Sequence, residues 1–412
     1  MTRDGERVTF RSVLGVREFR AMWTAELLSI AGDQLARVAL SVLVFQRTAS
    51  AFLTGLTYAL TFVPALVGGI LLSSLGDRYP RRDVMVVADL VRAVLVGFMA
   101  VPGVPLWPLC TLVAVVTLLN GPFKAAQHAL LPDVLSGSKY TVGMAIRNIT
   151  NQLAQLLGFA GGGALVSAIN PSVGLALNAA TFLLSAVVLR RGVGHRPAAI
   201  QRAASSGRMP FLASTTAGAR VVWRDPALRV LLALCWLAGF YITPEALAAP
   251  YADSLETGAL GVGLIMASDP LGSVIGGIVF GRWVPEHQQV RVIGVLGILA
   301  GVPLVFCALQ PGLVTSMALF AIAGALATPY TIQGTASYTR KLPDAQRAQG
   351  SGLLSSGLIT IQGLGALAAG VFADLVGPAH AIALAGLTGA IVAVPIAVGW
   401  RRAKRSAIEE SR

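Results

Sequence analysis

The stretch FLTGLTYALTFVPALVGGILLSSL (residues 52–75) is followed directly by GDRYPRRD (residues 76–83). The first stretch has no charged residue in 24 positions, whereas the second has five in eight. An α-helix needs about 20 apolar residues to cross about 30 Å of hydrocarbon. The first stretch therefore predicts a membrane-spanning helix, and the second predicts the loop in which that helix ends.

Similar apolar runs recur along the whole chain, for example RVIGVLGILAGVPLVFCAL at residues 291–309. Only 12% of the 412 residues are charged, against about 25% in soluble domains. Sheet edges cannot face lipid, so we expect an all-α membrane protein. We predict twelve spans, centred near Ala31, Pro64, Ala93, Val116, Leu156, Leu183, Ala238, Ser268, Leu299, Ala323, Leu358 and Ala390.

The chain repeats itself at about half its length. FVPALVGGIL (residues 62–71) is echoed by SDPLGSVIGGIV (residues 268–279), and GPFKAAQHALLPDV (residues 121–134) by TPYTIQGTASYTRKLPDA (residues 328–345). This repeat predicts two six-helix bundles, residues 1–189 and 226–412. Residues 190–225 are basic and contain Gly, Ser and Pro, so we expect a cytoplasmic linker there, with a short interfacial helix around Trp223.

The net charge of +13 follows the expected membrane topology. If the amino terminus is cytoplasmic, nearly every Lys and Arg outside the spans falls on the cytoplasmic side, which is the positive-inside pattern. Both termini are then cytoplasmic, in a multi-pass protein of the cell membrane. No loop interleaves basic and aromatic residues as single-stranded nucleic-acid binding requires, so nucleic acid is not an expected partner.

The charged loop resembles the cytoplasmic signature of the major facilitator superfamily, Gly-x-Leu-Ala-Asp-Arg-x-Gly-Arg-Arg/Lys. The matching positions are Leu75, Asp77, Arg78, Arg81 and Arg82, while Ser73 and Pro80 replace the two glycines of that signature. The resemblance extends over the whole chain and implies two six-helix bundles that alternate access to a central site. It also implies that Asp77 meets a helix end of the opposite half and acts with the three arginines as a conformational switch.

A second, partial signature lies in the fifth span. LLGFAGGGALV (residues 156–166) resembles the Gly-Pro-x-x-Gly-Gly motif of antiporters in this superfamily, with Gly158, Gly162 and Gly163 in place and Phe159 instead of proline. Close helix packing alone would also explain these glycines. The whole pattern is most similar to the bacterial branch of enterobactin exporters and macrolide efflux pumps.

Charged residues within spans are costly in lipid and mark functional sites. Glu26, Asp33 and Arg37 share a stripe about 40° wide on the first span, with Asp33 near mid-membrane. We expect Asp33 to carry the coupled proton, with Arg37 as its partner; the alternative is a static ion pair. Asp89 and Arg92, near the cytoplasmic end of the third span, are interpreted as part of the charge network of the loop.

The rival proton sites are Glu26 in the first span and, in the second half, Glu245 and Asp269. Pro244 predicts a break in the seventh span beside Glu245. The substrate-cavity candidates are polar side chains on the fifth and seventh spans. They are Asn148, Asn151, Gln152, Gln155 and Tyr241. Bonds between helices are an equally good explanation of the four amides.

These features predict a monomeric secondary active exporter, and we expect it to exchange protons for small amphipathic compounds such as drugs, antibiotics or siderophores. The alternatives are a proton-coupled uptake symporter and a membrane receptor that transports nothing. The four histidines show no metal-ligand spacing, and no nucleotide-binding loop follows a strand. We therefore expect no metal, no cofactor and no enzymatic activity. Membrane lipid is the expected environment of the protein.

Overall fold

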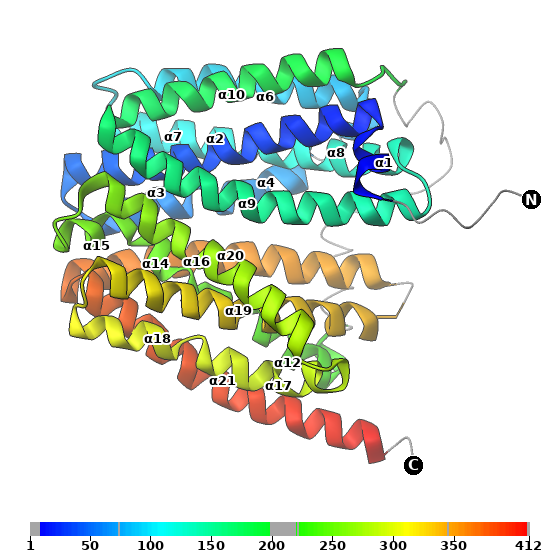
Figure 1. The fold of residues 1–412 in the computed structure, drawn as a ribbon, viewed down its shortest axis with the longest axis vertical. Helices are drawn as coiled ribbons and strands as arrows, with labels where there is room; N and C mark the ends of the chain where they lie inside the picture. Colours follow the sequence, from blue (N-terminus) through cyan, green and yellow to red (C-terminus); the bar gives the residue numbers. More distant parts are fainter. Residues whose placement is uncertain (1–8, 73–74, 198–219, 221, 344–345, 410–412) are drawn as a thin grey trace, which may run out of the picture. The chain divides into compact units, whose positions relative to one another are not determined.

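The computed structural model describes residues 9–72, 75–197, 220, 222–343 and 346–409, and within these ranges the regular structure is entirely helical (Figure 1). Within the described residues, ten helical stretches are long and apolar enough to cross a membrane. The two other predicted spans are α6 (Arg81–Met99) and α9 (Ser138–Ala168). Both helices reach spanning length, but α6 carries five charged residues in 19 positions, and α9 carries four amides together with Lys139 and Arg147.

Contacts along the chain define two compact units. The first consists of Met1–Leu40 and Pro64–Ser206, and the second of Ser41–Val63 and Gly207–Arg412. A short segment from the N-terminal half of the sequence thus belongs to the second unit. The helix α2 (Arg17–Thr48) is continuous across the boundary at Leu40.

The helices of the first unit, besides α2, α6 and α9, follow in chain order. They are α1 (Phe10–Leu14), α4 (Val63–Leu72), α5 (Leu75–Arg78), α7 (Leu106–Leu118), α8 (Asn120–Val134) and α10 (Pro171–Gly192). The helix α10 lies along α6, as Figure 1 shows at its upper edge, and α6 also packs against α8. Aliphatic and Phe side chains from α2, α6, α8, α9 and α10 form the core.

The second unit begins with α3 (Ala51–Ala59) and continues after the linker. Its other helices are α12 (Pro226–Trp236), α13 (Ala238–Tyr241), α14 (Thr243–Ala246), α15 (Ala248–Ser254), α16 (Gly258–Trp283), α17 (Glu286–Leu299), α18 (Val302–Val305), the 3-10 helix η2 (Phe306–Leu309), α19 (Leu313–Lys341), α20 (Arg347–Val376) and α21 (Pro378–Glu409). The closest pairs are α16 with α19 and α20 with α3. A second apolar core lies among α12, α17, α19, α20 and α21.

The linker is bounded by clear helix ends. The helix α10 ends at Gly192, and α12 begins at Pro226, where the Asp225 carboxylate accepts a hydrogen bond of 2.8 Å from the backbone N–H of Ala227. Proline at the first turn and aspartate before it are typical of a helix start. Of the predicted interfacial helix, most residues lie outside the described ranges, but Trp223 is described and exposed.

The seventh span is interrupted, as the sequence predicts. The segment from Pro226 to Ser254 is divided into α12, α13, α14 and α15, and Pro244 occupies the first turn of α14. Because proline has no N–H to donate, a helix restarts at this residue more readily than it continues through it. The break places Glu245 in α14, a single helical turn that is separated from α13 before it and from α15 after it.

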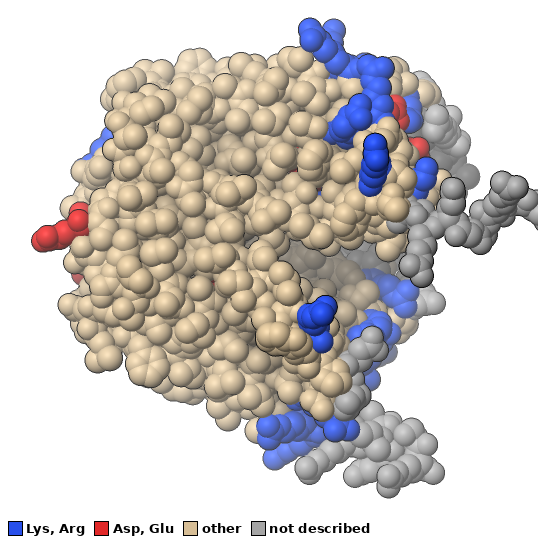
Figure 2. All heavy atoms as spheres, in the orientation of Figure 1, with Lys and Arg blue, Asp and Glu red and all other residues tan. Residues whose placement is uncertain are grey.

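Basic side chains gather at one end of each unit. In the first unit the exposed ones flank α1, α5 and the ends of α9 and α10, and they form the blue group near the label α1 (compare Figures 1 and 2). In the second unit the exposed Arg and Lys residues, apart from Arg47 in the last turn of α2, lie near α12, α17 and the neighbouring helix ends. The rest of the visible surface is mostly uncharged, as expected for helices that face lipid.

Candidate transport site

Glu26 on α2 forms a two-pronged ion pair with Arg147 on α9. The Nε of Arg147 donates to Glu26 Oε2 at 2.6 Å, and its Nη2 donates to Oε1 at 2.7 Å. The same Nη2 donates to Gln127 Oε1 of α8 at 3.0 Å. Arg147 and Gln127 are buried. This arrangement ties α2, α8 and α9 together, so Glu26 is compensated by a fixed partner.

Asp89 and Arg92 on α6 form a second, fully buried ion pair. Asp89 also accepts a hydrogen bond of 2.6 Å from the Ser185 hydroxyl of α10, and Arg92 donates to the side-chain oxygen of Asn120. The guanidinium lies 4.6 Å from the ring centre of Phe123 and 4.5 Å from that of Phe182. Their assignment to the charge network of the loop is wrong, because the pair is enclosed among α6, α8 and α10.

Asp33 on α2 is half-buried and lies in an electropositive part of the first unit. Three cations act on it electrostatically, namely Arg92, Arg37 and Lys124. The sequence analysis anticipated only Arg37, one turn away. Lys124 on α8 is exposed and forms no ion pair among the described residues. Asp33 therefore differs from Glu26 and Asp89, each of which is held by a buried arginine.

The four amides of α9 follow one side of the helix next to Arg147. Asn148 is exposed, whereas Asn151, Gln152 and Gln155 are half-buried. Gln155 Nε2 donates to Asn151 Oδ1 at 3.1 Å, within the same helix. The partly exposed amides can accept or donate hydrogen bonds to a ligand on this side of α9.

The glycine motif lies further along α9 and contacts α2. A Cβ atom on Gly158 would lie 2.8 Å from the Cβ of Gln34, and one on Gly162 would lie 3.1 Å from the Cα of Leu35. Gly163 is buried as well. These contacts show that two of the three glycines permit close approach of α9 and α2, whatever further role the motif has.

The loop arginines form a separate charge network at the basic end of the first unit. Arg81 Nη1 donates to Asp133 Oδ2 and to the carbonyl oxygen of Ala129, both at 2.7 Å, and thereby joins α6 to α8. Arg82 pairs with Asp83 at 2.9 Å, while Arg78 is exposed. The backbone of Asp77 is helical in α5, but its side chain lies outside the described part of the structure.

Arg196, beyond the end of α10, extends this network to the start of α2. Its Nη2 donates to Glu18 Oε2 at 2.6 Å, and the backbone N–H of Gly194 donates to Glu18 Oε1 at 2.8 Å. The hydrogen bond that Arg196 donates to the Glu18 carboxylate raises the pKa of Arg196. The first residues of the linker are thus tied to the first unit, which they follow in the sequence.

In the second unit, Glu245 accepts a hydrogen bond from the phenol of Tyr58 on α3. Asp269 on α16 is the acidic neighbour of Glu245 and acts on it electrostatically. A Cβ atom on Gly324 of α19 would lie 2.6 Å from Asp269 Oδ1, so this carboxylate is packed against α19. The structure thus brings together the two rival acids, and it adds Tyr58, which the sequence analysis missed because 187 positions separate it from Glu245.

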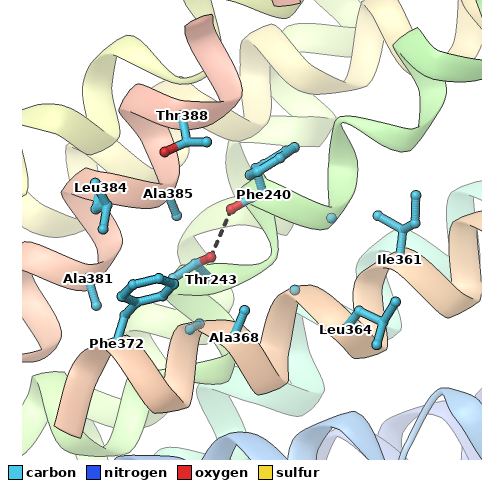
Figure 3. Close-up of a pocket in the computed structure, with 13 residues that line it drawn as sticks. Phe240, Thr243, Ile361, Leu364, Ala368, Phe372, Ala381, Leu384, Ala385 and Thr388 are labelled. Carbon is cyan, nitrogen blue, oxygen red and sulfur yellow. Dashed lines mark hydrogen bonds between the residues drawn. The ribbon is translucent and has the colours of Figure 1, made fainter. Parts of the chain in front are cut away.

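Tyr241 has its own partners. Its hydroxyl donates to the carbonyl oxygen of Gly297 at 2.6 Å, and its ring meets Tyr330 edge to face at 6.5 Å. A cavity of about 500 Å³ lies nearby among α13, α14, α20 and α21, but Tyr241 is not part of its wall. Figure 3 shows that this wall is mostly apolar, and that the Thr243 hydroxyl bonds to the Phe240 carbonyl oxygen.

Both units contain acidic side chains within their membrane-spanning helices. Each unit holds at least one span acid that is half-buried: Asp33 in the first, and Glu245 and Asp269 in the second. No group of three or more metal-ligating side chains occurs in the described ranges. Acids of this kind in membrane helices mark proton or substrate pathways.

The chain belongs to the Major Facilitator Superfamily, which matches it over residues 22–249 and again over residues 246–412. The match confirms the fold class expected from the sequence and identifies the protein as a multi-pass membrane transporter. The enterobactin exporter EntS of Shigella boydii serotype 4 (strain Sb227) is 25% identical over 389 residues, covering 91% of this chain and 90% of that protein. The multidrug efflux pump Tap of Mycobacterium tuberculosis (strain ATCC 25618 / H37Rv) is 28% identical over 382 residues, covering 88% of each.

Solved transporter structures share the fold. The crystal structure of the peptide transporter POT in complex with sulfate superimposes with a TM-score of 0.73 at 16% identity, covering 97% of this chain and 99% of that one. At this level of identity the likeness concerns the fold alone. The similarity to exporters therefore rests on the sequence relatives EntS and Tap.

Proposed function

We propose that the protein is a secondary active exporter that exchanges protons for small amphipathic compounds across the cytoplasmic membrane. The observation that carries the proposal is Asp33, a half-buried acid at the middle of a span and near three cations. Among the described residues it has no fixed ion-pair partner like those of Glu26 and Asp89. A carboxylate in this position can change its protonation state when its surroundings change.

Coupling requires that proton and substrate affect each other's binding. A substrate that approaches Asp33, Lys124 and the amides of α9 changes the electrostatic environment of the acid and displaces water from it. Release of a proton on one side of the membrane then accompanies binding of the substrate. Glu245 and Asp269 in the second unit are the rival proton sites, and both are included in the experiment below.

The direction of transport and the substrate class rest on the relatives, which are named as an enterobactin exporter and a multidrug efflux pump. Amide side chains suit varied ligands because they bind through hydrogen bonds without requiring one charge. The basic ends of the helices support cytoplasmic termini by the positive-inside rule. We also propose that the protein acts as a monomer in membrane lipid, without a cofactor and without enzymatic activity.

The proposal is tested by transport in proteoliposomes that contain the purified protein, with ethidium as a fluorescent amphipathic probe. We expect a pH gradient, acidic inside, to drive accumulation of ethidium, and an uncoupler to abolish it. Variants Asp33→Asn, Glu245→Gln and Asp269→Asn identify the proton site. The matched control is Asp253→Asn, which changes an exposed acid of α15.

Movement of ethidium out of these acidic vesicles, driven by the pH gradient, would favour the symporter. Binding of ligands without any flux across a panel of amphipathic compounds would favour a receptor.

A further inference from the structure

Two helices of the second unit, α17 and α21, meet closely near the basic end of that unit. The Nε1 of Trp400 on α21 donates a hydrogen bond of 2.9 Å to the carbonyl oxygen of Val290 on α17. A Cβ atom on Gly294 of α17 would lie 2.8 Å from the Cβ and 3.0 Å from the Cα of Ala397 on α21. The two helices are therefore fixed against each other at this point.

Each of these helices carries an exposed arginine one turn beyond the closest approach. Arg291 lies three residues before Gly294 on α17, and Arg401 lies four residues after Ala397 on α21. Residues three or four apart are neighbours on a helix surface. Because α17 begins and α21 ends on the basic side, both arginines lie on that side of the contact.

The helix α12 adds a third arginine. A Cβ atom on Gly399 of α21 would lie 3.2 Å from Cγ2 of Val230, so α12 also contacts the last part of α21. Arg229 directly precedes Val230 and is exposed. In this part of the unit, over the last turns of α21, basic side chains gather on the surface (compare Figures 1 and 2). The three arginines at this helix junction, Arg229, Arg291 and Arg401, are named the arginine cluster.

Within the described residues, the arginine cluster has no carboxylate partner. None of its three members forms an ion pair there. Asp225, an acid at this end of the unit, caps α12 and pairs with Lys341 at 3.2 Å. Like charges at one helix junction repel each other, so an anion from outside the chain is favoured beside them.

Apolar side chains continue from the arginine cluster along the outer surface of α17 and α21. On each helix they recur at spacings of three or four residues, so they form one stripe in line with the arginine of that helix. They are Val295 and Leu299 on α17, and Ile391, Val394 and Val398 on α21, all between 36% and 61% exposed. Exposed apolar stripes on membrane-spanning helices face the acyl chains of lipid.

Two exposed tryptophans indicate the depth of this end of the unit in the membrane. Trp223, shortly before α12, is 61% exposed, and Trp283, the last residue of α16, is 72% exposed. Tryptophan is enriched where the hydrocarbon meets the headgroups. The arginine cluster lies at the same end of the unit, which places it at the depth of lipid phosphates.

We propose that the arginine cluster binds an anionic phospholipid. The guanidinium groups bind the phosphate of the headgroup, and the acyl chains lie along the stripes of α17 and α21. Arginine suits phosphate because its planar fork donates paired hydrogen bonds. The stripes favour a lipid over a free phosphate ion, since only the lipid contacts both the arginines and the apolar surface. The bound lipid joins α12, α17 and α21, and the inference does not depend on the direction or coupling of transport.

Native mass spectrometry of the purified full chain in detergent measures association constants for single lipid molecules. The titrants are phosphatidylglycerol, which is anionic, and phosphatidylcholine, which is zwitterionic, with identical acyl chains. The test variant replaces all three arginines of the cluster by glutamine. The matched control removes three exposed charges from the basic end of the first unit. It is Lys139→Gln/Arg190→Gln/Arg191→Gln.

We expect the wild type and the control to prefer phosphatidylglycerol, and the test variant to bind both lipids equally. Each single substitution, Arg229→Gln, Arg291→Gln or Arg401→Gln, should lower the constant for phosphatidylglycerol about fivefold, the scale for one basic residue near an anionic membrane. A variant with lysine at all three positions keeps the charges and should keep most of the preference. The single variants and the lysine variant also serve if the triple glutamine variant does not fold.

Thermal unfolding provides a second measurement. A ligand that binds only the folded protein raises its melting temperature. Phosphatidylglycerol should therefore raise the melting temperature of the wild type and of the control more than phosphatidylcholine does, and this difference should vanish in the test variant.

Equal binding of the two lipids by the wild type would overturn the proposal. So would an equal loss of preference in the control and the test variant, which would show attraction to net charge alone. Inorganic phosphate is added as a competitor. Displacement of phosphatidylglycerol by millimolar phosphate would show a site for a free anion and would contradict a lipid site.

Discussion

Replacement of Asp89 by asparagine should destabilise the protein strongly. Asp89 and Arg92 have side-chain exposures of 0% and 1%. Asparagine keeps the shape of the side chain but removes the negative charge, so the guanidinium stays buried without its counter-charge. Breaking a buried ion pair from one side costs about 3–5 kcal/mol.

The lower end of that range applies here. Arg92 keeps its hydrogen bond to Asn120 and its contacts with the rings of Phe123 and Phe182, all of which favour the cation in place. We therefore expect the free energy of unfolding to fall by about 3 kcal/mol. At about 2–4 °C per kcal/mol, the melting temperature should fall by about 6–12 °C.

Thermal unfolding of the purified protein in detergent, followed by tryptophan fluorescence, measures this shift. The exposed Asp253→Asn variant serves as the control and should change the free energy of unfolding by less than about 0.5 kcal/mol. The double variant Asp89→Leu/Arg92→Met replaces the pair by apolar side chains and should recover most of the loss. A melting temperature of Asp89→Asn within about 1 °C of that of the wild type would contradict the claim that Asp89 and Arg92 form a buried, stabilising ion pair.

Two further predictions concern the loop and the glycine motif. Asp77→Asn should cut ethidium transport severely while leaving the melting temperature nearly unchanged, because the resemblance assigns Asp77 to a conformational switch; wild-type transport rates would contradict this. Gly158→Leu places a side chain where a Cβ already lies 2.8 Å from Gln34, and such overpacking should cost about 1–3 kcal/mol in thermal unfolding. Gly161→Leu, where no heavy atom lies within 4 Å, is its control, and equal melting of the two variants would rule out the packing role.

The spans were accessible from the sequence because lipid demands long apolar helices. Hydropathy alone does not identify α6 and α9 as membrane spans. Their polar residues are paired inside the first unit, as with Arg147 of α9 and Glu26. The break at Pro244 was also predictable, since proline disrupts a helix locally.

The partners of the site residues were less accessible, because they depend on contacts between distant helices. Arg147 lies 121 positions from Glu26, and Tyr58 lies 187 positions from Glu245. The spacing of Asp89 and Arg92, three residues apart, allows an ion pair within one helix. The sequence does not show that α8 and α10 enclose this pair. The hydrogen bond from the Tyr241 hydroxyl to the carbonyl oxygen of Gly297 joins residues 56 positions apart and was not predictable from the sequence.

The central claim, that an acid within the first span couples protons to substrate, is tested most directly by Asp33→Asn in proteoliposomes. Asparagine mimics the permanently protonated acid. We predict that accumulation of ethidium driven by a pH gradient is lost, while exchange of ethidium across the membrane without a gradient persists, with a melting temperature close to that of the wild type. Gradient-driven accumulation at the wild-type rate in Asp33→Asn would contradict the account.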